Sequence, residues 1–224
     1  MRFILGIDTA GPEGSVALTR LGQGSALEAL PQGGHSSGLS AAVARLLEGA
    51  GIGLGAVDAF AVNEGPGSFT GLRIGFAWAK GAALGTKRPI VLVRAHEAMA
   101  LAHATDADRV VTAIPGARGI VEAALWEGGR LAWGPESLEE GDLIPALLQR
   151  GPVLRLAIVS ATPKLAQSLA AEAAEEEIGM LAPRPLAPAV AEIGARLLSE
   201  GRVADLTLAS PAYGREPNAR KPAS

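Results

Sequence analysis

The chain has 224 residues, 48% of them hydrophobic and 19% charged, with a net charge of −3. This length and composition allow one large core or two smaller ones. The absence of cysteine excludes a disulfide framework, a cysteine nucleophile and a Cys-based zinc site, and it fits a reducing cytoplasm. Because 20 basic and 23 acidic residues are well mixed, the charge pattern does not indicate independent binding of nucleic acid.

The first segment is predicted to be a hairpin. Residues 3–7 form an apolar run typical of a buried strand, and residues 15–19 form the returning strand. The run is too short for a signal peptide or a membrane span, so we expect a cytoplasmic protein without membrane contact. Asp8 and Thr9 lie at the turn end of the first strand, where an aspartate commonly accepts hydrogen bonds from the amides of its own turn.

An amphipathic helix is predicted over residues 36–50. Leu39, Val43 and Leu46 recur at helical spacing, a serine is placed to cap the start, and a glycine follows the end. Only two residues of this segment are charged, so the face opposite the apolar stripe consists mainly of small residues.

The most informative stretch is residues 65–75, GPGSFTGLRIG. It lies between an apolar run at 59–62, which predicts a buried strand, and a helix predicted over 70–85. Ser68 or Thr70 is placed to cap that helix, so the amides of the turn should face whatever lies in front of it. We call residues 65–71 the signature turn.

Two glycines of the signature turn, Gly65 and Gly67, permit a positive φ or the close approach of another backbone. The turn could therefore hold an anion or the backbone of another chain, and the residue types do not decide between them. It does not match known phosphate loops, because a P-loop needs a lysine where this chain has Leu72. The dinucleotide fingerprint would need a glycine where it has Thr70.

The helix predicted at 70–85 carries glycines and alanines, including Ala79, around Phe76 and Trp78. Together with the helix at 36–50 it is small and apolar on most sides, which is typical of helices buried on more than one face. One interpretation is burial within the monomer. The other is contact with the equivalent helices of another subunit.

Residues 65–75 closely resemble the signature of the bacterial TsaB (YeaZ) family, whose relatives belong to the actin-like ATPase, sugar kinase and Hsp70 (ASKHA) fold group. The resemblance extends to three further places in the chain, namely the opening hairpin at 4–9 and 15–18, His35-Ser36 at the first helix start, and Tyr213-Gly214-Arg215. It covers residues 1 to about 105 well, and the second half mainly in the order of elements.

The second half repeats the pattern of the first. After a strand at 89–93 and a helix at 95–104, a shift of 107 residues aligns residues 109–125 with residues 2–18, with five identities in seventeen positions. The predicted elements then follow in the same order, as a strand at 130–134, a helix at 137–150, a strand at 153–159 and helical segments near 164–176 and 188–199.

We therefore predict an α/β protein of two related ribonuclease-H-like lobes, each a mixed sheet flanked by helices. The N-terminal lobe is expected at 1–105, a smaller degenerate lobe at 106–213 and a tail at 214–224.

The resemblance makes Asp8, Thr9, Gly65 and Gly67 a vestigial nucleotide-binding site. ATP-using members of the fold group hold phosphates and magnesium between two acidic hairpins, and in this chain the repeat aligns Asp8 with Pro115. A proline offers neither a carboxylate for magnesium nor an amide for phosphate. An active small ATPase or phosphotransferase remains the alternative, favoured by Asp8 and the amide-rich turn.

No catalytic residue or metal site is predicted. His96 and His103 are seven residues apart on one helix, hence about 10 Å along its axis, too far for one metal ion. Ser68 lacks the G-x-S-x-G elbow of a hydrolase, so a peptidase has no nucleophile here.

The family resemblance implies a non-catalytic scaffold and activator subunit for threonylcarbamoyladenosine (t6A) modification of tRNA. The implied partners are the catalytic paralogue TsaD and the ATPase TsaE, with threonylcarbamoyl adenylate made by TsaC, a homodimer when alone, and tRNA contacted only indirectly. We expect no intrinsic cofactor, with a subunit interface as the place where ATP or ADP could bind. The expected partner interface is Leu39, Val43, Leu46, Ser68, Phe69, Thr70, Arg73, Phe76 and Ala79.

Overall fold

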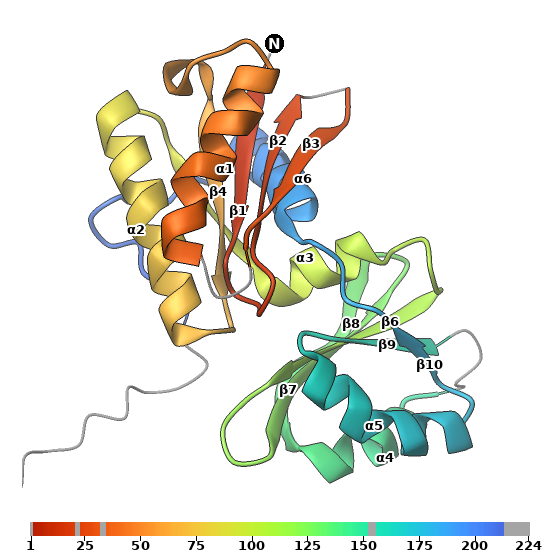
Figure 1. The fold of residues 1–224 in the computed structure, drawn as a ribbon. Helices are drawn as coiled ribbons and strands as arrows, with labels where there is room; N and C mark the ends of the chain where they lie inside the picture. Colours follow the sequence, from red (N-terminus) through yellow and green to blue (C-terminus); the bar gives the residue numbers. More distant parts are fainter. Residues whose placement is uncertain (1, 21–22, 32–34, 152–155, 213–224) are drawn as a thin grey trace, which may run out of the picture.

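The computed structural model describes residues 2–20, 23–31, 35–151 and 156–212, and these form two lobes, each built on a five-stranded mixed sheet (Figure 1). The two-lobed α/β architecture is as predicted. The expected motif at 213–215 lies outside the described residues.

The first sheet has the strand order β3-β2-β1-β4-β5. Its strands are β1 (Phe3–Asp8), β2 (Ser15–Arg20), β3 (Ser25–Ala29), β4 (Ala59–Gly65) and β5 (Ile90–Arg94). β1 is antiparallel to β2 and parallel to β4, which confirms the predicted hairpin. β1 is buried along almost its whole length because helices cover both faces of the sheet, and a strand covered on both sides reads as a continuous apolar run.

Two helices, α1 (His35–Gly49) and α2 (Phe69–Thr86), cover one face of this sheet, and a short 3₁₀ turn, η1 (Leu54–Ala56), precedes β4 (Figure 1). The opposite face is covered by α6 (Ala187–Ser199) together with α3 (Ala95–Ala102). A Cβ atom at Gly6 of β1 would lie 2.3 Å from the carbonyl oxygen of Ala187, so this glycine lets α6 lie directly on the strand.

The position of α6 differs from the sequence-based division, which assigned residues 106–213 to the second lobe. The helix returns to the first lobe and packs on β1, β2 and β4. Periodicity showed that this segment has an apolar face, but it carries no information about which of two sheets that face covers.

The second sheet has the order β10-β9-β6-β7-β8, the same as the first sheet when each strand is replaced by its counterpart, which confirms the repeat. Its strands are β6 (Arg109–Pro115), β7 (Ile120–Glu127), β8 (Arg130–Glu139), β9 (Leu156–Ser160) and β10 (Gly179–Leu181). The helices of this lobe are η2 (Glu140–Asp142), α4 (Leu143–Leu148) and α5 (Pro163–Glu175). α4 and α5 pack on one face through a shared apolar cluster.

The helix predicted at 137–150 is wrong at its start. Ser137 pairs with Glu122 and Leu138 pairs with Val121, so these residues extend β8, and the helix begins only at Leu143. Pairing with β7 satisfies the backbone there, and this tertiary contact overrides the local preference.

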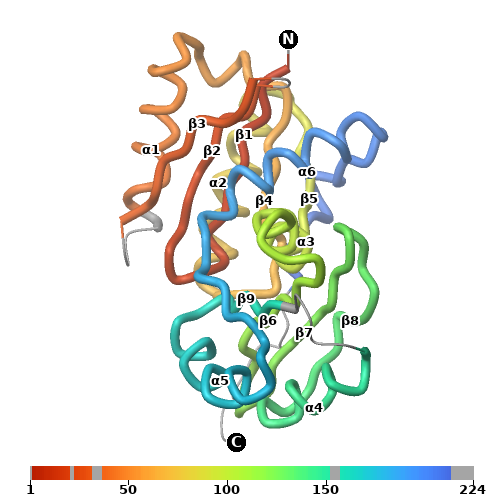
Figure 2. The backbone as a smooth tube through the Cα atoms, turned by 90° about the vertical axis from the view of Figure 1, so that its right-hand side faces the viewer, coloured from red at the N-terminus to blue at the C-terminus, as the bar shows by residue number. Residues whose placement is uncertain are grey.

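The chain crosses between the lobes twice, once between α3 and β6 and once between β10 and α6 (Figure 2). After α6 it runs back beside the first lobe, where the Ala204 amide donates to Ile90 and the Ala212 amide donates to Glu64. Between these points Lys80 Nζ of α2 donates to the carbonyl oxygen of Ala209. Within the described ranges, no helix combines the length and the apolar character needed to cross a membrane.

Candidate functional site

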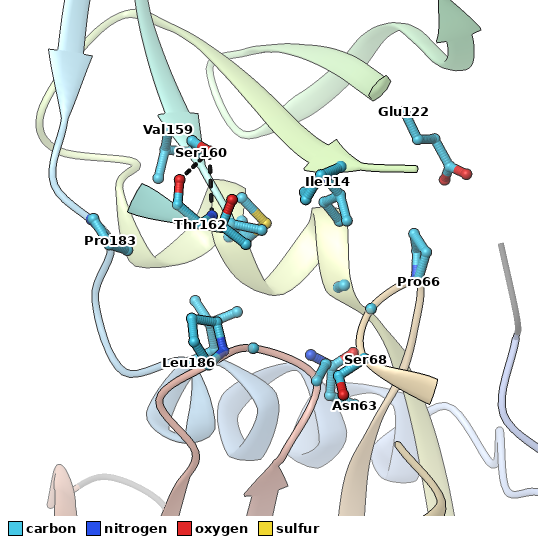
Figure 3. A pocket seen from close by; sticks show the side chains of 18 of the residues that line it. Asn63, Pro66, Ser68, Ile114, Glu122, Val159, Ser160, Thr162, Pro183 and Leu186 are labelled. Carbon is cyan, nitrogen blue, oxygen red and sulfur yellow. Dashed lines mark hydrogen bonds between the residues drawn. The ribbon is translucent and has the colours of Figure 1, made fainter. Parts of the chain in front are cut away.

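A cleft of about 1070 Å³ separates the two lobes. It lies where β1, β4, β6 and β9 end, so the carboxyl ends of strands from both sheets face each other across it. Figure 3 shows Asn63 and Ser68 of the first lobe opposite Ile114, Ser160 and Thr162 of the second. In open α/β sheets, ligands bind at such carboxyl edges, so the cleft is the first candidate site.

Asp8 ends β1 at the wall of the cleft and is 2% exposed. Its Oδ1 accepts hydrogen bonds from the Ala10 amide at 3.1 Å and from Asn63 Nδ2 at 2.8 Å. Asn63 Oδ1 in turn accepts from the Gly65 amide at 2.9 Å. The predicted hydrogen bond from an amide of its own turn to Asp8 is therefore present. Through Asn63, the carboxylate is also linked to the start of the signature turn.

The signature turn holds the β1–β2 hairpin of its own chain. The Ser68 amide donates to the Ala10 carbonyl at 2.7 Å, and Thr9 Oγ1 donates to the Gly71 carbonyl at 2.7 Å. The Gly71 amide donates to Ser68 Oγ at 3.2 Å, so Ser68 caps α2 as one of the two predicted capping residues. The Ser68 and Gly71 amides thus bond to groups of this chain. Of the two alternatives for the turn, an anion or a backbone, this favours a backbone, but it is the backbone of the chain's own hairpin.

The glycines make this contact sterically feasible. A Cβ at Gly71 would lie 1.9 Å from the Thr9 carbonyl oxygen, and one at Gly67 would lie 2.7 Å from that of Ala10. Gly65 has φ +106°, a conformation that favours glycine. The predicted roles of Gly65 and Gly67 in positive φ and close approach are therefore both observed.

Five of the expected partner-contact residues do not reach the surface, because they pack in the core between the first sheet and its helices. They are Leu39, Val43, Leu46, Phe76 and Ala79, each at most 5% exposed. The expectation that these side chains are buried between chains is wrong. Their regular spacing marked the stripe that faces the sheet, and the exposed positions between them include the small residues Ala41, Ala44, Ala77 and Gly81.

The remaining four, Ser68, Phe69, Thr70 and Arg73, are exposed at the start of α2. Phe69 is 40% exposed, and the Arg73 guanidinium carbon lies 3.7 Å from its ring centroid, in the geometry of a cation–π contact. Further along α2, Trp78 Nε1 donates to Ser40 Oγ of α1 at 3.0 Å and joins the two helices. The two helices thus present one joined outer surface that begins beside the cleft.

The two helical histidines, which sequence reasoning considered only as metal ligands, are buried in polar networks. His96 Nδ1 lies 2.8 Å from Thr112 Oγ1 and its Nε2 lies 3.1 Å from Glu122 Oε1, which joins α3 to the second sheet. This hydrogen bond with His96 lowers the pKa of Glu122, and it outweighs the opposing effect of burial. The sequence did contain a signal for this role: His96 lies in a mainly apolar helix, and a polar side chain that is buried there needs hydrogen-bond partners.

His103, at the end of α3, bonds through Nδ1 to Asp106 Oδ2 at 2.8 Å. Arg184, from the second crossing, lies 3.0 Å from the same carboxylate oxygen and also donates to the Ala102 carbonyl. Burial lowers the pKa of His103, while the hydrogen bond with His103 lowers the pKa of Asp106. Both interlobe crossings are thus connected at one point beside the cleft.

On the second-lobe side, the polar groups also bond within the chain. Ser160 Oγ donates to the Thr162 carbonyl at 2.8 Å, and Thr162 Oγ1 accepts from the Leu165 amide and caps α5. Pro115 ends β6 as Asp8 ends β1, as the repeat alignment required. No group of three His, Asp or Glu residues that could hold a metal ion is found in the described part of the chain.

Comparison with known proteins gives three kinds of similarity. The family model described as TsaD, tRNA N6-adenosine threonylcarbamoyltransferase, matches residues 30–134. The chain is 37% identical over 113 residues to the tRNA threonylcarbamoyladenosine biosynthesis protein TsaB of Haemophilus influenzae, covering 50% of this chain and 48% of that protein. It is 36% identical over 135 residues to the Escherichia coli K12 protein of the same name, covering 56% and 58%.

The chain thus matches about half the length of these curated relatives. A crystal structure from Pseudomonas aeruginosa, described as an uncharacterized protein with similarity to peptidase YeaZ, has a TM-score of 0.77 and 24% identity. That alignment covers 96% of this chain and all of the other, so the complete two-lobed fold is shared.

Proposed function

Because the chain belongs to the TsaB (YeaZ) family, we propose that it is a non-catalytic subunit of the machinery that makes threonylcarbamoyladenosine in tRNA. In this proposal it organises and activates the threonylcarbamoyltransferase TsaD, works with the ATPase TsaE, and reaches tRNA only through its partners. Two observations support the proposal. The chain is similar to two TsaB proteins, and Asp8, at the place where ATP-using members of the fold group hold phosphates, bonds within the chain.

The non-catalytic role is inferred from the residues that end β1 and β6, the first strand of each hairpin. Asp8 bonds to Asn63 and to its own turn, and its counterpart in the second sheet is Pro115. A phosphotransferase needs carboxylates that organise magnesium and amides that point at phosphate. We therefore place no bond chemistry in this chain, and we expect ATP or ADP only at a boundary between subunits.

The proposed contact with TsaD is the outer surface of α1 and α2, which we define by Ala41, Ala44, Ala77 and Gly81 and call the helix-pair surface. All four are exposed, and a Cβ at Gly81 would meet nothing within 4 Å. Small residues let a second pair of helices approach closely and form a four-helix contact. Phe69 and Arg73 lie on α2 as well and are of the types that dominate interface energetics.

The same surface serves self-association in this proposal, so the homodimer and the complex with TsaD exclude each other. Titrating TsaD into the isolated chain during analytical ultracentrifugation checks this point. The homodimer peak should be replaced by a heterodimer peak, and a stable assembly in which two copies of this chain stay joined while TsaD is bound would contradict mutual exclusion.

Reconstitution tests the function. Purified TsaD, TsaE and the enzyme that makes threonylcarbamoyl adenylate are incubated with unmodified tRNA, with and without this chain, and the modified nucleoside is quantified. We expect modification to depend on the chain. Full activity in its absence would refute the proposal, and an Asp8→Ala variant that folds should support modification as the native chain does.

A further inference from the structure

The second-lobe wall of the cleft carries a row of three side chains that changes from apolar to acidic to hydroxyl. Ile114 of β6 pairs with Glu122 of β7, and Glu122 pairs with Ser137 of β8. Residues paired across neighbouring strands lie side by side on one face of a sheet. All three line the cleft, and Figure 3 shows Ile114 and Glu122 on this wall.

The apolar end of this row continues into the floor of the cleft. The floor is formed by six residues of one buried cluster, from α3, the ends of β6 and β9 and the second crossing: Ala95, Met99, Ile114, Val159, Ala161 and Leu186. With a volume of about 1070 Å³, the cleft can enclose a small organic molecule whose body covers this floor.

Glu122 presents a charged oxygen to the cleft. Its Oε1 accepts a hydrogen bond from His96 Nε2 at 3.1 Å, and this bond lowers the pKa of Glu122, so the group is a carboxylate at neutral pH. The side chain is 26% exposed. Its second oxygen, Oε2, has no hydrogen bond within the described residues, where His103 Nε2 is the one unpaired atom that is also buried. Oε2 is therefore accessible to a molecule in the cleft.

The basic side chains around the cleft are directed to other carboxylates. Arg94 is close enough to lower the pKa of Glu122 further, but its Nε lies 3.4 Å from Glu64. The lining residues in the described part of the chain include one arginine and no lysine, and this residue, Arg184, pairs with Asp106. A cleft lined by carboxylates favours a cation as its ligand.

We propose that the cleft binds an organic cation, an amine whose apolar body lies on the floor and whose ammonium group donates to Glu122 Oε2. Ser137 Oγ, beside Glu122 in the row, is a second acceptor for the same group. Anions are disfavoured, because Asp8 and Glu13 add two more carboxyl groups to the lining. The proposal does not depend on binding to TsaD and stands or fails separately from it.

A matched set of indole probes tests the proposal. Tryptamine carries an ammonium group, tryptophol has a hydroxyl group in its place, and indole-3-acetate carries a negative charge. Binding is followed by the methyl signals of ¹³C-methionine-labelled protein, since Met99 lines the cleft while Met180 packs in the core of the second lobe. Met99 should shift on titration with tryptamine and Met180 should not.

We expect tryptamine to bind about tenfold tighter than tryptophol, the factor for one hydrogen bond to a charged group, and indole-3-acetate to bind weakest. In Glu122→Gln, which keeps an acceptor for His96 but removes the charge, the advantage of tryptamine should fall below about twofold. The matched control is Glu127→Gln, which removes the same charge from the exposed far end of the same strand and should keep the native preference. In Ala161→Leu, which fills the floor and leaves Glu122 intact, tryptamine and tryptophol should weaken together.

Four results would overturn the proposal: equal affinity of tryptamine and tryptophol in the native protein, binding of indole-3-acetate as tight as that of tryptamine, an unchanged preference in folded Glu122→Gln, or no Met99 shift with tryptamine. Because the first two comparisons use only the native protein, they remain decisive even if Glu122→Gln does not fold.

Discussion

The turn after β1 and the turn after β6 occupy equivalent places in two sheets of the same topology. The first ends in Asp8, which Asn63 holds from β4, and the signature turn closes over it. The second ends in Pro115 and closes on itself, through hydrogen bonds from the Gly116 amide to Ile120 and from the Ile120 amide to Ala117. The two turns have equivalent places in their sheets, and of the two strand ends only the one that bonds to another part of its lobe carries a polar side chain.

The comparison also shows where the chain tolerates change. The first turn is joined to β4 and α2 by buried hydrogen bonds and close backbone contacts, whereas Pro115 is exposed. Substitutions in the first turn should therefore affect the whole lobe, and those at the equivalent place in the second should have local effects.

The largest effect is expected for Gly71→Ala. The added methyl group would lie 1.9 Å from the Thr9 carbonyl oxygen, and a backbone atom cannot move aside without separating the turn from the hairpin. We expect the free energy of unfolding to fall by about 3 kcal/mol or more, measured by urea denaturation. The matched control is Gly81→Ala in the same helix, where nothing lies within 4 Å, and it should gain about 0.5–1 kcal/mol. Equal stability of the two variants would show that the close approach of Gly71 to the Thr9 carbonyl group does not contribute to the free energy of unfolding.

The helix-pair surface gives the next largest effect. Ala77→Arg places a charge at the centre of the proposed contact, where it would lose its hydration without a counter-ion, and the cost of about 3 kcal/mol corresponds to roughly a hundredfold weaker binding of TsaD. Ala170→Arg on the exposed side of α5 is the matched control and should bind as the native chain does. Surface plasmon resonance with immobilised TsaD measures both. Native affinity of a folded Ala77→Arg would place the contact elsewhere.

The two hairpin ends can be compared directly by substitution. Asp8→Ala leaves Asn63 Nδ2 and the Ala10 amide without this acceptor, so we expect a loss of about 2 kcal/mol in the free energy of unfolding. Pro115→Ala removes an exposed side chain at the equivalent place and should change stability by at most about 0.5 kcal/mol. Similar losses of unfolding free energy in both variants would mean that Asp8 and Pro115 contribute equally to stability, despite their different hydrogen bonding.

A smaller effect concerns pH. The native pKa of His103 is lowered from 6.5 by burial, so as pH falls below 6.5 the unfolded chain takes up a proton that the native ring resists. This contribution to stability is present at higher pH and is lost as pH falls from 6.5 toward the lower native pKa. Urea denaturation at pH 7.5 and pH 5.5 should show a smaller decrease for His103→Phe than for the native chain. An unchanged decrease would assign the pH dependence to other groups.

The smallest effect is expected with nucleotide. Calorimetric titration of the isolated chain with ATP and magnesium should show no binding in the submillimolar range, because both hairpin ends direct their polar groups into their own lobe. Submillimolar affinity with turnover, abolished by Asp8→Ala, would instead establish the alternative of an active ATPase.

Much of this protein can be read from local sequence patterns. The hairpins, the strand before the signature turn, the helices α1 and α2 and the repeated order of elements follow from apolar periodicity and from glycines and caps. These signals are local, since a strand or helix repeats its apolar positions over a few residues whatever it packs against. The signature turn was found in the same way, including the need for glycine at positions 65 and 67.

Other features depend on contacts between distant segments, which no local pattern specifies. The apolar stripe of α2 is evident in the sequence, yet only packing shows that Phe76 faces the sheet while Ala77 faces outward. Tertiary contacts likewise place α6 on the first sheet, extend β8 through Ser137, and bring Arg184 from the second crossing to Asp106, the partner of His103. Periodicity identifies a side chain as apolar or polar, but the partner of each side chain is decided by the fold, because the free energy of packing and hydrogen bonding depends on groups far apart in the chain.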